Sequence, residues 1–241
     1  ITTLTDSGLA VGALFVVRLL APFLVSPIAG VVADRYNRKT ILLLADIIRG
    51  ITVLGFLFIR QPEQVWLLYV LTAIQLGISG FFFPTKSAIL PNVVSANELG
   101  AANAIASATW SVMLAFGAAL GGLVAGLFGN DPAFILDSFT FFLSAFFVWR
   151  VRYSGQPELG GDQSIRAALQ QYLDGLRYLA QKADILVISL QKAANALIVT
   201  SGMEVALVQV AEQIYVIGEG GGIGLGIMYG VSGVGTGVGR I

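Results

Sequence analysis

The chain has 241 residues, of which 56% are hydrophobic and 12% are charged, and its 14 cations balance its 14 acids. Globular domains carry about 25% charged residues, so this composition and a mean hydropathy of +0.82 indicate a membrane protein. The sequence has no cysteine and no histidine, which excludes disulfides, thiolate nucleophiles, Cys/His zinc sites and Ser-His-Asp triads.

Seven apolar runs are long enough, or nearly long enough, to cross a bilayer as helices, which takes about 20 residues. In chain order they are 8–33, 41–59, 65–83, 101–128, 132–151, 185–210 and 223–241. The last run is unfinished and the first residue is Ile1. We therefore expect the chain to be an internal piece of a longer protein, with its first and last helices missing.

The cations lie almost entirely in alternate connections between these runs. Nine of them, counting Arg150 at the edge of the third connection, lie in three connections: 34–39, 84–100 and 152–184. The connections on the opposite side hold only Arg60. Cytoplasmic loops carry such an excess of Lys and Arg, so we expect these three connections to be cytoplasmic and the protein to be a multi-pass protein of the plasma (inner) membrane.

The longest polar stretch, 153–184, has two parts. Residues 155–162 are rich in Gly, Pro and acidic residues and are typical of a linker. Apolar residues then recur at helical spacing: Ile165, Leu169, Tyr172, Leu173, Leu176 and Leu179. This pattern predicts an amphipathic helix, either lying on the cytoplasmic membrane surface or packed as a soluble helix on the bundle.

The connection between the first two runs carries four charged residues in Gly30-Val31-Val32-Ala33-Asp34-Arg35-Tyr36-Asn37-Arg38-Lys39. The spacing G-x-x-x-D-R-x-x-R-K resembles the loop signature of the major facilitator superfamily of secondary transporters. In that family the loop is a latch that holds the two halves closed on the cytoplasmic side.

The resemblance implies gating roles for five residues of this loop: Gly30, Asp34, Arg35, Arg38 and Lys39. Gly30 would let two helices approach closely, and Asp34 would face a helix N-terminus. Asn37 stands where the family usually has glycine, and asparagine tolerates a left-handed conformation. The alternative is a basic loop that fixes topology without a gating role.

Gly117-Ala118-Ala119-Leu120-Gly121-Gly122 is similar to the family's antiporter motif G-P-x-x-G-G, with Ala118 in place of the proline. Gly117 and Gly121, and likewise Gly122 and Gly126, make small-x-x-x-small faces on a helix. The resemblance favours an exporter, and ordinary close packing is the alternative. Gly226 and Gly230 begin a similar glycine face in the last run.

The segment Pro84–Pro91, Glu98 and Ala102-Asn103-Ala104 resemble the branch of siderophore exporters and macrolide efflux proteins. The family implies an all-α, polytopic bundle, here a partial fold with about seven of a presumed twelve helices. Residues 1–152 would be most of the N-terminal six-helix bundle. Residues 153–184 would be a central cytoplasmic segment, and 185–241 the start of the C-terminal bundle.

Ionisable residues within spans are costly and are functional candidates. They are Arg18, Asp46, Arg49, Asp137, Lys192 and Glu204. Asp46 and Arg49 can pair with each other or with Arg18, and this cluster is either structural or functional. Glu204 has no cation within one helical turn, so it is a candidate proton carrier unless a missing helix supplies its partner. Candidates for the substrate path are Gln75, Asn103, Trp110 and Asn195.

The resemblance implies proton-coupled efflux of a hydrophobic or amphipathic small molecule, such as a drug, macrolide or siderophore, by alternating access. The proton gradient would be the energy source, with no cofactor and no metal. We expect a monomer in the bilayer that binds no nucleic acid and is not an enzyme. The alternatives are a lysophospholipid transporter of the same family, a membrane-embedded lipid enzyme and a non-transporting scaffold.

Overall fold

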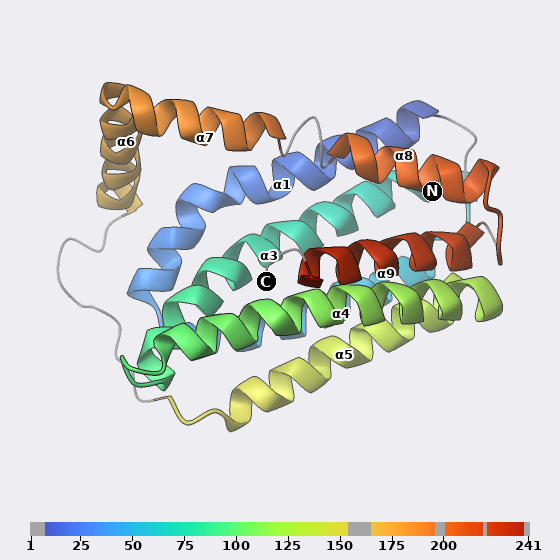
Figure 1. Cartoon of the computed structure of the whole chain (residues 1–241), viewed down its shortest axis with the longest axis horizontal. Coiled ribbons are helices and arrows are strands. Elements are labelled where there is room, and N and C mark those ends of the chain that lie inside the picture. The colour runs from blue at the N-terminus through green and yellow to red at the C-terminus, as the bar shows by residue number, and fades with distance from the viewer. Residues whose placement is uncertain (1–7, 154–164, 196–200, 219–220, 239–241) are drawn as a thin grey trace. The chain divides into compact units, whose positions relative to one another are not determined.

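The computed structural model describes residues 8–153, 165–195, 201–218 and 221–238, and every regular element within these ranges is helical (Figure 1). The elements are α1 (Gly8–Arg35), α2 (Arg38–Gly55), the 3-10 turns η1 (Phe56–Phe58) and η2 (Pro62–Gln64), α3 (Val65–Val93), α4 (Leu99–Phe128), α5 (Asn130–Arg150), α6 (Ile165–Gln181), α7 (Ala183–Asn195), α8 (Ser201–Gln213) and α9 (Gly222–Val238). The all-α prediction is confirmed.

Five of the predicted spans are helices long and apolar enough to cross a membrane. They are Gly12–Arg35, Arg38–Phe58, Pro62–Val93, Leu99–Phe128 and Asn130–Arg150. Large apolar side chains are exposed along all five, as expected of surfaces that face lipid. The sixth predicted run is divided between α7 and α8, with 196–200 outside the described residues, and the seventh is the shorter helix α9.

The loop predicted at 84–100 is shorter in the structure. α3 continues to Val93 with Pro84 and Pro91 inside the helix, so only 94–98 joins it to α4. A membrane helix tolerates proline because neighbouring helices and hydroxyl side chains satisfy the backbone groups that proline leaves free. The predicted span ended at residue 83, ten residues before the end of α3, because the rule that proline ends a helix comes from soluble proteins.

Glu98 holds the connection between α3 and α4 in place. Its carboxylate accepts the Ser95 hydroxyl at 2.7 Å and the Ser95 backbone N–H at 3.2 Å. The hydroxyl first, and the N–H second, hold the pKa of Glu98 below its ordinary value. A carboxyl with a lowered pKa stabilises the fold above its unfolded-state pKa and loses that effect as the pH falls through the folded-state pKa. We therefore expect these contacts to weaken only in acid.

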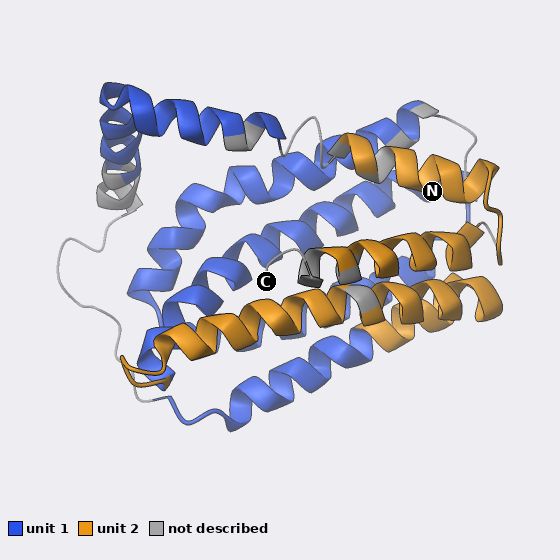
Figure 2. Cartoon of the chain, viewed as in Figure 1, with its two compact units in different colours: residues 1–93, 138–199 blue, residues 94–137, 200–241 orange. Residues whose placement is uncertain are grey.

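Contacts between helices divide the chain into two compact units (Figure 2). The first comprises residues 1–93 and 138–199, and the second comprises 94–137 and 200–241. The boundary crosses α5, so these units follow spatial contact rather than chain order. The division at 152 and 184 that the resemblance implies stays a prediction.

In the first unit, α2 is the most deeply buried of the spanning helices. α3 packs against both α1 and α2, while α6 contacts α1 and α7. α5 is joined to α2 by Ser138, whose hydroxyl donates to the backbone oxygen of Gly50 at 2.8 Å. A Cβ on Gly50 would lie 3.0 Å from the Phe142 ring. Small residues and hydroxyl groups therefore set this packing, as is usual between helices in lipid.

In the second unit, α9 packs along α4 and also contacts α8. The turn from α8 to α9 requires glycine at Gly221, which has φ +74°. A Cβ there would also overlap the backbone oxygen of Ala211. The glycine thus permits the close return of α9 against α8.

Candidate functional site

The connection between α1 and α2 is only two residues long. α1 runs to Arg35 and α2 begins at Arg38, with residues 36–37 between them. Asn37 is the N-cap of α2, and its side-chain oxygen accepts the backbone N–H of Thr40 at 3.1 Å. Its φ is −59°, so the expected left-handed conformation is not used. Asparagine directly before an apolar helix is the signal that could have predicted this cap.

Arg38 links the ends of two helices. Its Nε donates to the backbone oxygen of Ala33 in the last turn of α1 at 3.2 Å. Its Nη1 donates to the Ala88 backbone oxygen at 2.9 Å and to Asn92 Oδ1 at 2.6 Å, both in the last two turns of α3. Asp34 lies 3.8 Å from Arg38, with its side chain 71% exposed. The carboxylate is thus a weak, solvated partner of a half-buried guanidinium.

Lys39 binds the end of a third helix. Its Nζ donates to the backbone oxygens of Trp149 and Val151, both at 2.8 Å, where α5 ends. Carbonyls at a helix C-terminus lack an intrahelical partner and carry the negative end of the helix dipole. We call Arg38 and Lys39 with these carbonyls the helix-end clamp. It brings the C-termini of α1, α3 and α5 to one place.

Gly30 and Arg35 are the other two predicted loop residues. A Cβ on Gly30 would have nothing within 4 Å, so the close helix approach expected there is not found in the described part of the chain. Arg35 is partly buried in the last turn of α1. The gating roles of all five residues stay predictions.

Replacing Lys39 with methionine tests the clamp. Loss of a cation from an exposed helix C-terminus costs about 0.3–1 kcal/mol, so Lys39→Met should lower the thermal unfolding temperature of the detergent-purified protein. The matched control is Lys86→Met, which removes an exposed cation from α3 and should leave that temperature nearly unchanged. Equal effects of the two substitutions would contradict the clamp.

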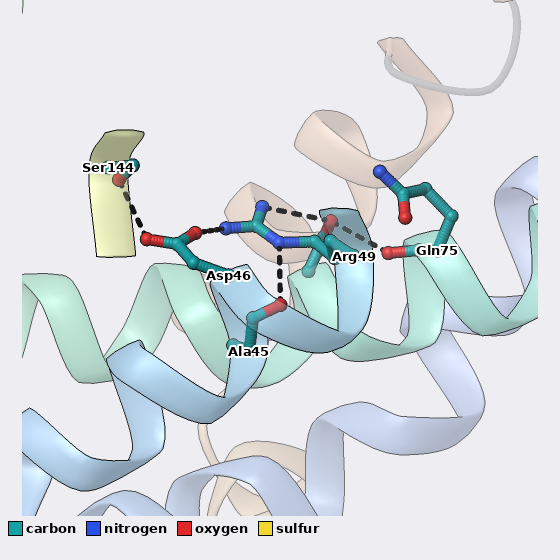
Figure 3. Close-up of polar contacts among 6 residues, drawn as sticks. Ala45, Asp46, Arg49, Gln75 and Ser144 are labelled. Atoms are coloured by element: carbon teal, nitrogen blue, oxygen red, sulfur yellow. Dashed lines mark hydrogen bonds and ion pairs between the residues drawn. The ribbon is translucent and has the colours of Figure 1, made fainter. Parts of the chain in front are cut away.

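Asp46 and Arg49 form a buried ion pair in the middle of α2 (Figure 3). The two residues are only 1% and 7% exposed. One Asp46 oxygen pairs with Arg49 Nη2, and the other accepts the Ser144 hydroxyl of α5 at 2.7 Å. Both carboxylate oxygens therefore have donors, which a buried charge requires.

The guanidinium of Arg49 is held from several sides. Its Nε donates to the Ala45 backbone oxygen at 3.3 Å, and its Nη1 contacts Ser79 Oγ of α3 at 3.5 Å. The rings of Phe82 and Phe141 lie 4.2 and 4.6 Å from Arg49 Cζ, close enough for cation–π attraction. These contacts make a buried charge cluster that joins α2 to α3 and α5. Sequence analysis missed its partners, although serines within spans commonly bond across helices.

The remaining intramembrane candidates are Arg18, Asp137, Lys192 and Glu204. The guanidinium of Arg18 is exposed and lies over the Phe15 ring at 5.5 Å, so Asp46 pairs with Arg49 and the alternative pairing with Arg18 is not found. Asp137 is exposed on α5. The side chains of Lys192 and Glu204 lie outside the described residues, so the proton-carrier role of Glu204 stays a prediction.

Removing one charge of the buried pair should destabilise the protein more than removing both charges together. Removing one partner of a buried pair costs about 3–5 kcal/mol because the other charge is left uncompensated, whereas replacing both with apolar residues is often neutral. Asp46→Asn should therefore destabilise the detergent-purified protein far more than Asp46→Leu combined with Arg49→Met.

The chain offers a matched control for this comparison. Asp174 and Arg177 have the same i,i+3 spacing and a 3.0 Å contact, but their side chains are 67% and 74% exposed. Asp174→Asn should change the free energy of unfolding by less than about 1 kcal/mol. A comparable loss of unfolding free energy in Asp174→Asn and Asp46→Asn would show that burial does not set the cost of removing one charge of the pair.

The four predicted substrate-path residues differ in burial. Gln75 is partly buried, and its Oε1 is a buried acceptor with no hydrogen-bond partner among the described residues. Asn103 is exposed and donates to the Leu99 backbone oxygen of its own helix at 2.9 Å. Trp110 and Asn195 are exposed. Of these four, Gln75 offers a buried, unused acceptor, and the path itself stays a prediction.

The predicted antiporter-like motif divides into two faces. A Cβ on Gly122 would lie 2.5 Å from the backbone oxygen of Gly222 in α9, and one on Gly126 would lie 2.6 Å from Ile223. Gly117 and Gly121 would have nothing within 4 Å. We call the contact of Gly122 and Gly126 with α9 the glycine seam. Gly122 and Gly126 therefore lie against α9, and the antiporter role expected of the motif stays a prediction.

Adding one methyl group to each face tests the seam. Gly122→Ala would press a Cβ into the backbone of α9, and such overpacking costs typically about 1–3 kcal/mol. Gly121→Ala adds the same atom to open space and should be neutral or slightly stabilising. Thermal unfolding of the two purified variants measures the difference. Equal loss of stability would show that α4 and α9 do not meet at Gly122.

Five long apolar helices with exposed apolar faces, and helix ends held by cations, define a multi-pass α-helical membrane protein. The described residues bring no three Asp or Glu side chains together as a metal site would require. The sequence model of the Major Facilitator Superfamily matches residues 2–241, and the chain belongs to that superfamily.

Its relatives include bacterial transporters. The chain is 30% identical over 161 residues to an uncharacterized MFS-type transporter, YfiS, of Bacillus subtilis, covering 66% of this chain and 38% of that protein. It is 29% identical to a putative bacilysin exporter, BacE, of Bacillus amyloliquefaciens over 68% of this chain and 41% of the relative. It is 30% identical to a multi-drug resistance efflux pump, PmrA, of Streptococcus pneumoniae over 58% of this chain and 33% of the pump. No solved structure matches the chain.

Proposed function

We propose that this protein exports hydrophobic or amphipathic small molecules across the plasma (inner) membrane, in exchange for protons, by alternating access. Relatives named as an exporter and as an efflux pump support the outward direction. The segments aligned with them cover only 41% and 33% of those proteins, so the activity of the whole protein is part of the proposal.

The glycine seam is the observation that carries this proposal. α4 begins at Leu99, directly after the connection that we expect to be cytoplasmic, so its last turns, with Gly122 and Gly126, would lie near the outer surface. The family resemblance assigns α4 and α9 to different halves of the transporter. A path between the halves is closed where these backbones touch, and it can open only if the two helices part.

The clamp would act at the opposite surface. Arg38 and Lys39 hold three helix ends of the first unit through charge-assisted hydrogen bonds, and Asp34 balances Arg38 with an exposed carboxylate. The substitution Asp34→Asn would leave the cation of Arg38 without its nearest acid. In the proposal this shifts the balance between the inward-open and outward-open states.

The test is an efflux assay of the full-length protein in an efflux-deficient bacterium preloaded with a lipophilic dye or a macrolide. Efflux should depend on the protein and stop when a protonophore collapses the gradient. Asp34→Asn should slow efflux by roughly tenfold or more, equivalent to about 1.4 kcal/mol in the transport barrier. Asp174→Asn removes another exposed acid that already has a cation and should leave efflux intact.

Glu204→Gln, measured in the same assay, tests the proton-carrier role, which predicts loss of protonophore-sensitive efflux. Efflux that persists with a protonophore would overturn the coupling. If the wild type and every variant reached the membrane but none of them moved dye or macrolide, the exporter proposal would fail. Uptake of lysophospholipid by such cells would then identify the alternative transporter.

A further inference from the structure

Two polar side chains and one aromatic side chain form a strip along the half of α4 that we expect to be cytoplasmic. Asn103, Ser107 and Trp110 have i, i+4, i+7 spacing, which places them on one face of the helix. All three are exposed, Trp110 to 52%. We call these three residues the α4 strip. Because α4 is long and apolar enough to cross a membrane, polar groups on its surface are costly against lipid.

The polar groups of the α4 strip are not fully used by their own helix. The hydroxyls of Thr52 and Ser79, in other spanning helices, each donate to the backbone oxygen four residues earlier. Among the described residues the Ser107 hydroxyl makes no hydrogen bond. The Asn103 carboxamide makes one, from Nδ2 to the Leu99 backbone oxygen at 2.9 Å. The side-chain oxygens of Ser107 and Asn103 can therefore accept an N–H or O–H group from a bound molecule.

Trp110 lies deeper in its span than tryptophan usually does. It follows the first residue of α4, Leu99, at a distance of about 17 Å along the helix axis. It thus lies near the middle of a hydrocarbon core about 30 Å thick, whereas tryptophan is enriched at the two membrane surfaces. A broad, exposed ring at this depth is suited to stacking against another flat ring.

The glycine seam lies further along the same helix. Gly122 is about four turns beyond Ser107 and about 60° round the helix from it. α9 packs against that side of α4, where a Cβ on Gly226 would lie 2.8 Å from the Ala118 backbone oxygen. In the proposed transporter, a molecule on the α4 strip would therefore lie on the cytoplasmic side of the closed seam.

The composition of α4 limits what the strip can recognise. The 30 residues of α4 include no charged side chain, so α4 itself offers ring contact and hydrogen bonds rather than ion pairing. Asn103 and Trp110 are about 10 Å apart along the helix axis. A ligand of that length would place its ring on Trp110 and its polar end on Ser107 and Asn103.

We propose that the α4 strip is a substrate-contact site for molecules that carry a flat apolar ring at one end and an N–H or O–H group at the other. Trp110 stacks on the ring, and the side-chain oxygens of Ser107 and Asn103 accept the hydrogen bond. This inference rests on the proposed export function, because it names the class of molecule that is exported.

Binding to the purified full-length protein in lipid nanodiscs tests the site without transport. The probe is N-phenyl-1-naphthylamine, which has a flat ring system and one N–H and accepts energy from excited tryptophan. One variant keeps Trp110 as its sole tryptophan. The control variant keeps only Trp66, which is 62% exposed in the first turn of α3. The probe should quench Trp110 saturably, at concentrations several-fold below those that quench Trp66.

Removing one hydroxyl then tests the hydrogen bond. Ser107→Ala, made in the variant that keeps Trp110, should raise the Kd of the probe roughly three- to tenfold, the effect of one hydrogen bond. N-methyl-N-phenyl-1-naphthylamine carries a methyl group in place of the N–H hydrogen and should bind equally with and without Ser107→Ala. Thr109→Val removes another α4 hydroxyl, about 200° round the helix from Ser107, and should leave both Kd values unchanged.

Two results would overturn the site. Equal quenching of Trp110 and Trp66 at every concentration would show that the probe only dissolves in lipid. Equal effects of Ser107→Ala and Thr109→Val would show that the strip does not accept the hydrogen bond. Each variant is first required to elute from gel filtration as wild type does.

The same measurements separate this inference from the proposed function. Saturable quenching of Trp110 in a protein without efflux would support the site and overturn the export function. Efflux of the probe without preferential quenching of Trp110 would support export and overturn the site.

Discussion

A polar group withdrawn from water needs a hydrogen-bond partner or a counter-charge, and the first unit depends on how its helix ends and its buried charges find theirs. The last carbonyls of a helix have no partner within the helix. Arg38 and Lys39 bring donors to the ends of α1, α3 and α5. Because the connection between α1 and α2 is only two residues long, both donors stand at the first turn of α2. A short loop thereby becomes the point where three helix ends are held.

The same constraint governs charge inside the unit. Asp46 and Arg49 are tolerated in α2 because hydroxyls, a backbone oxygen and aromatic rings surround them. Both oxygens of the Asp46 carboxylate already accept donors from the protein. We therefore interpret the buried charge cluster as a device that positions α2 between α3 and α5. The proton-carrier role proposed for Glu204 does not involve this cluster.

Hydropathy predicted seven spans, and five of them are long apolar helices among the described residues, because a run of about 20 apolar residues has few alternatives to a membrane helix. It misplaced the end of α3 because rules for proline come from helices in water. The contacts of Asp46 and Arg49 with α3 and α5, and the choice of Gly122 over Gly121, depend on helix rotation. Gly121 and Gly122 are adjacent in sequence but point about 100° apart on a helix of 3.6 residues per turn. Both glycine faces can be recognised in the sequence, but which of them contacts another helix depends on tertiary packing.

The central claim is that α4 and α9 touch and part as the transporter works. The most direct test places spin labels on cysteines at Leu127 of α4 and Ile227 of α9, both exposed, in the reconstituted full-length protein. Distances between the labels would then be measured by pulsed electron paramagnetic resonance at several pH values, with and without a transported dye. The account predicts a short distance that gives way to a second, longer one as conditions change. A single short distance under every condition would contradict it, because the seam would then be a fixed joint and not a gate.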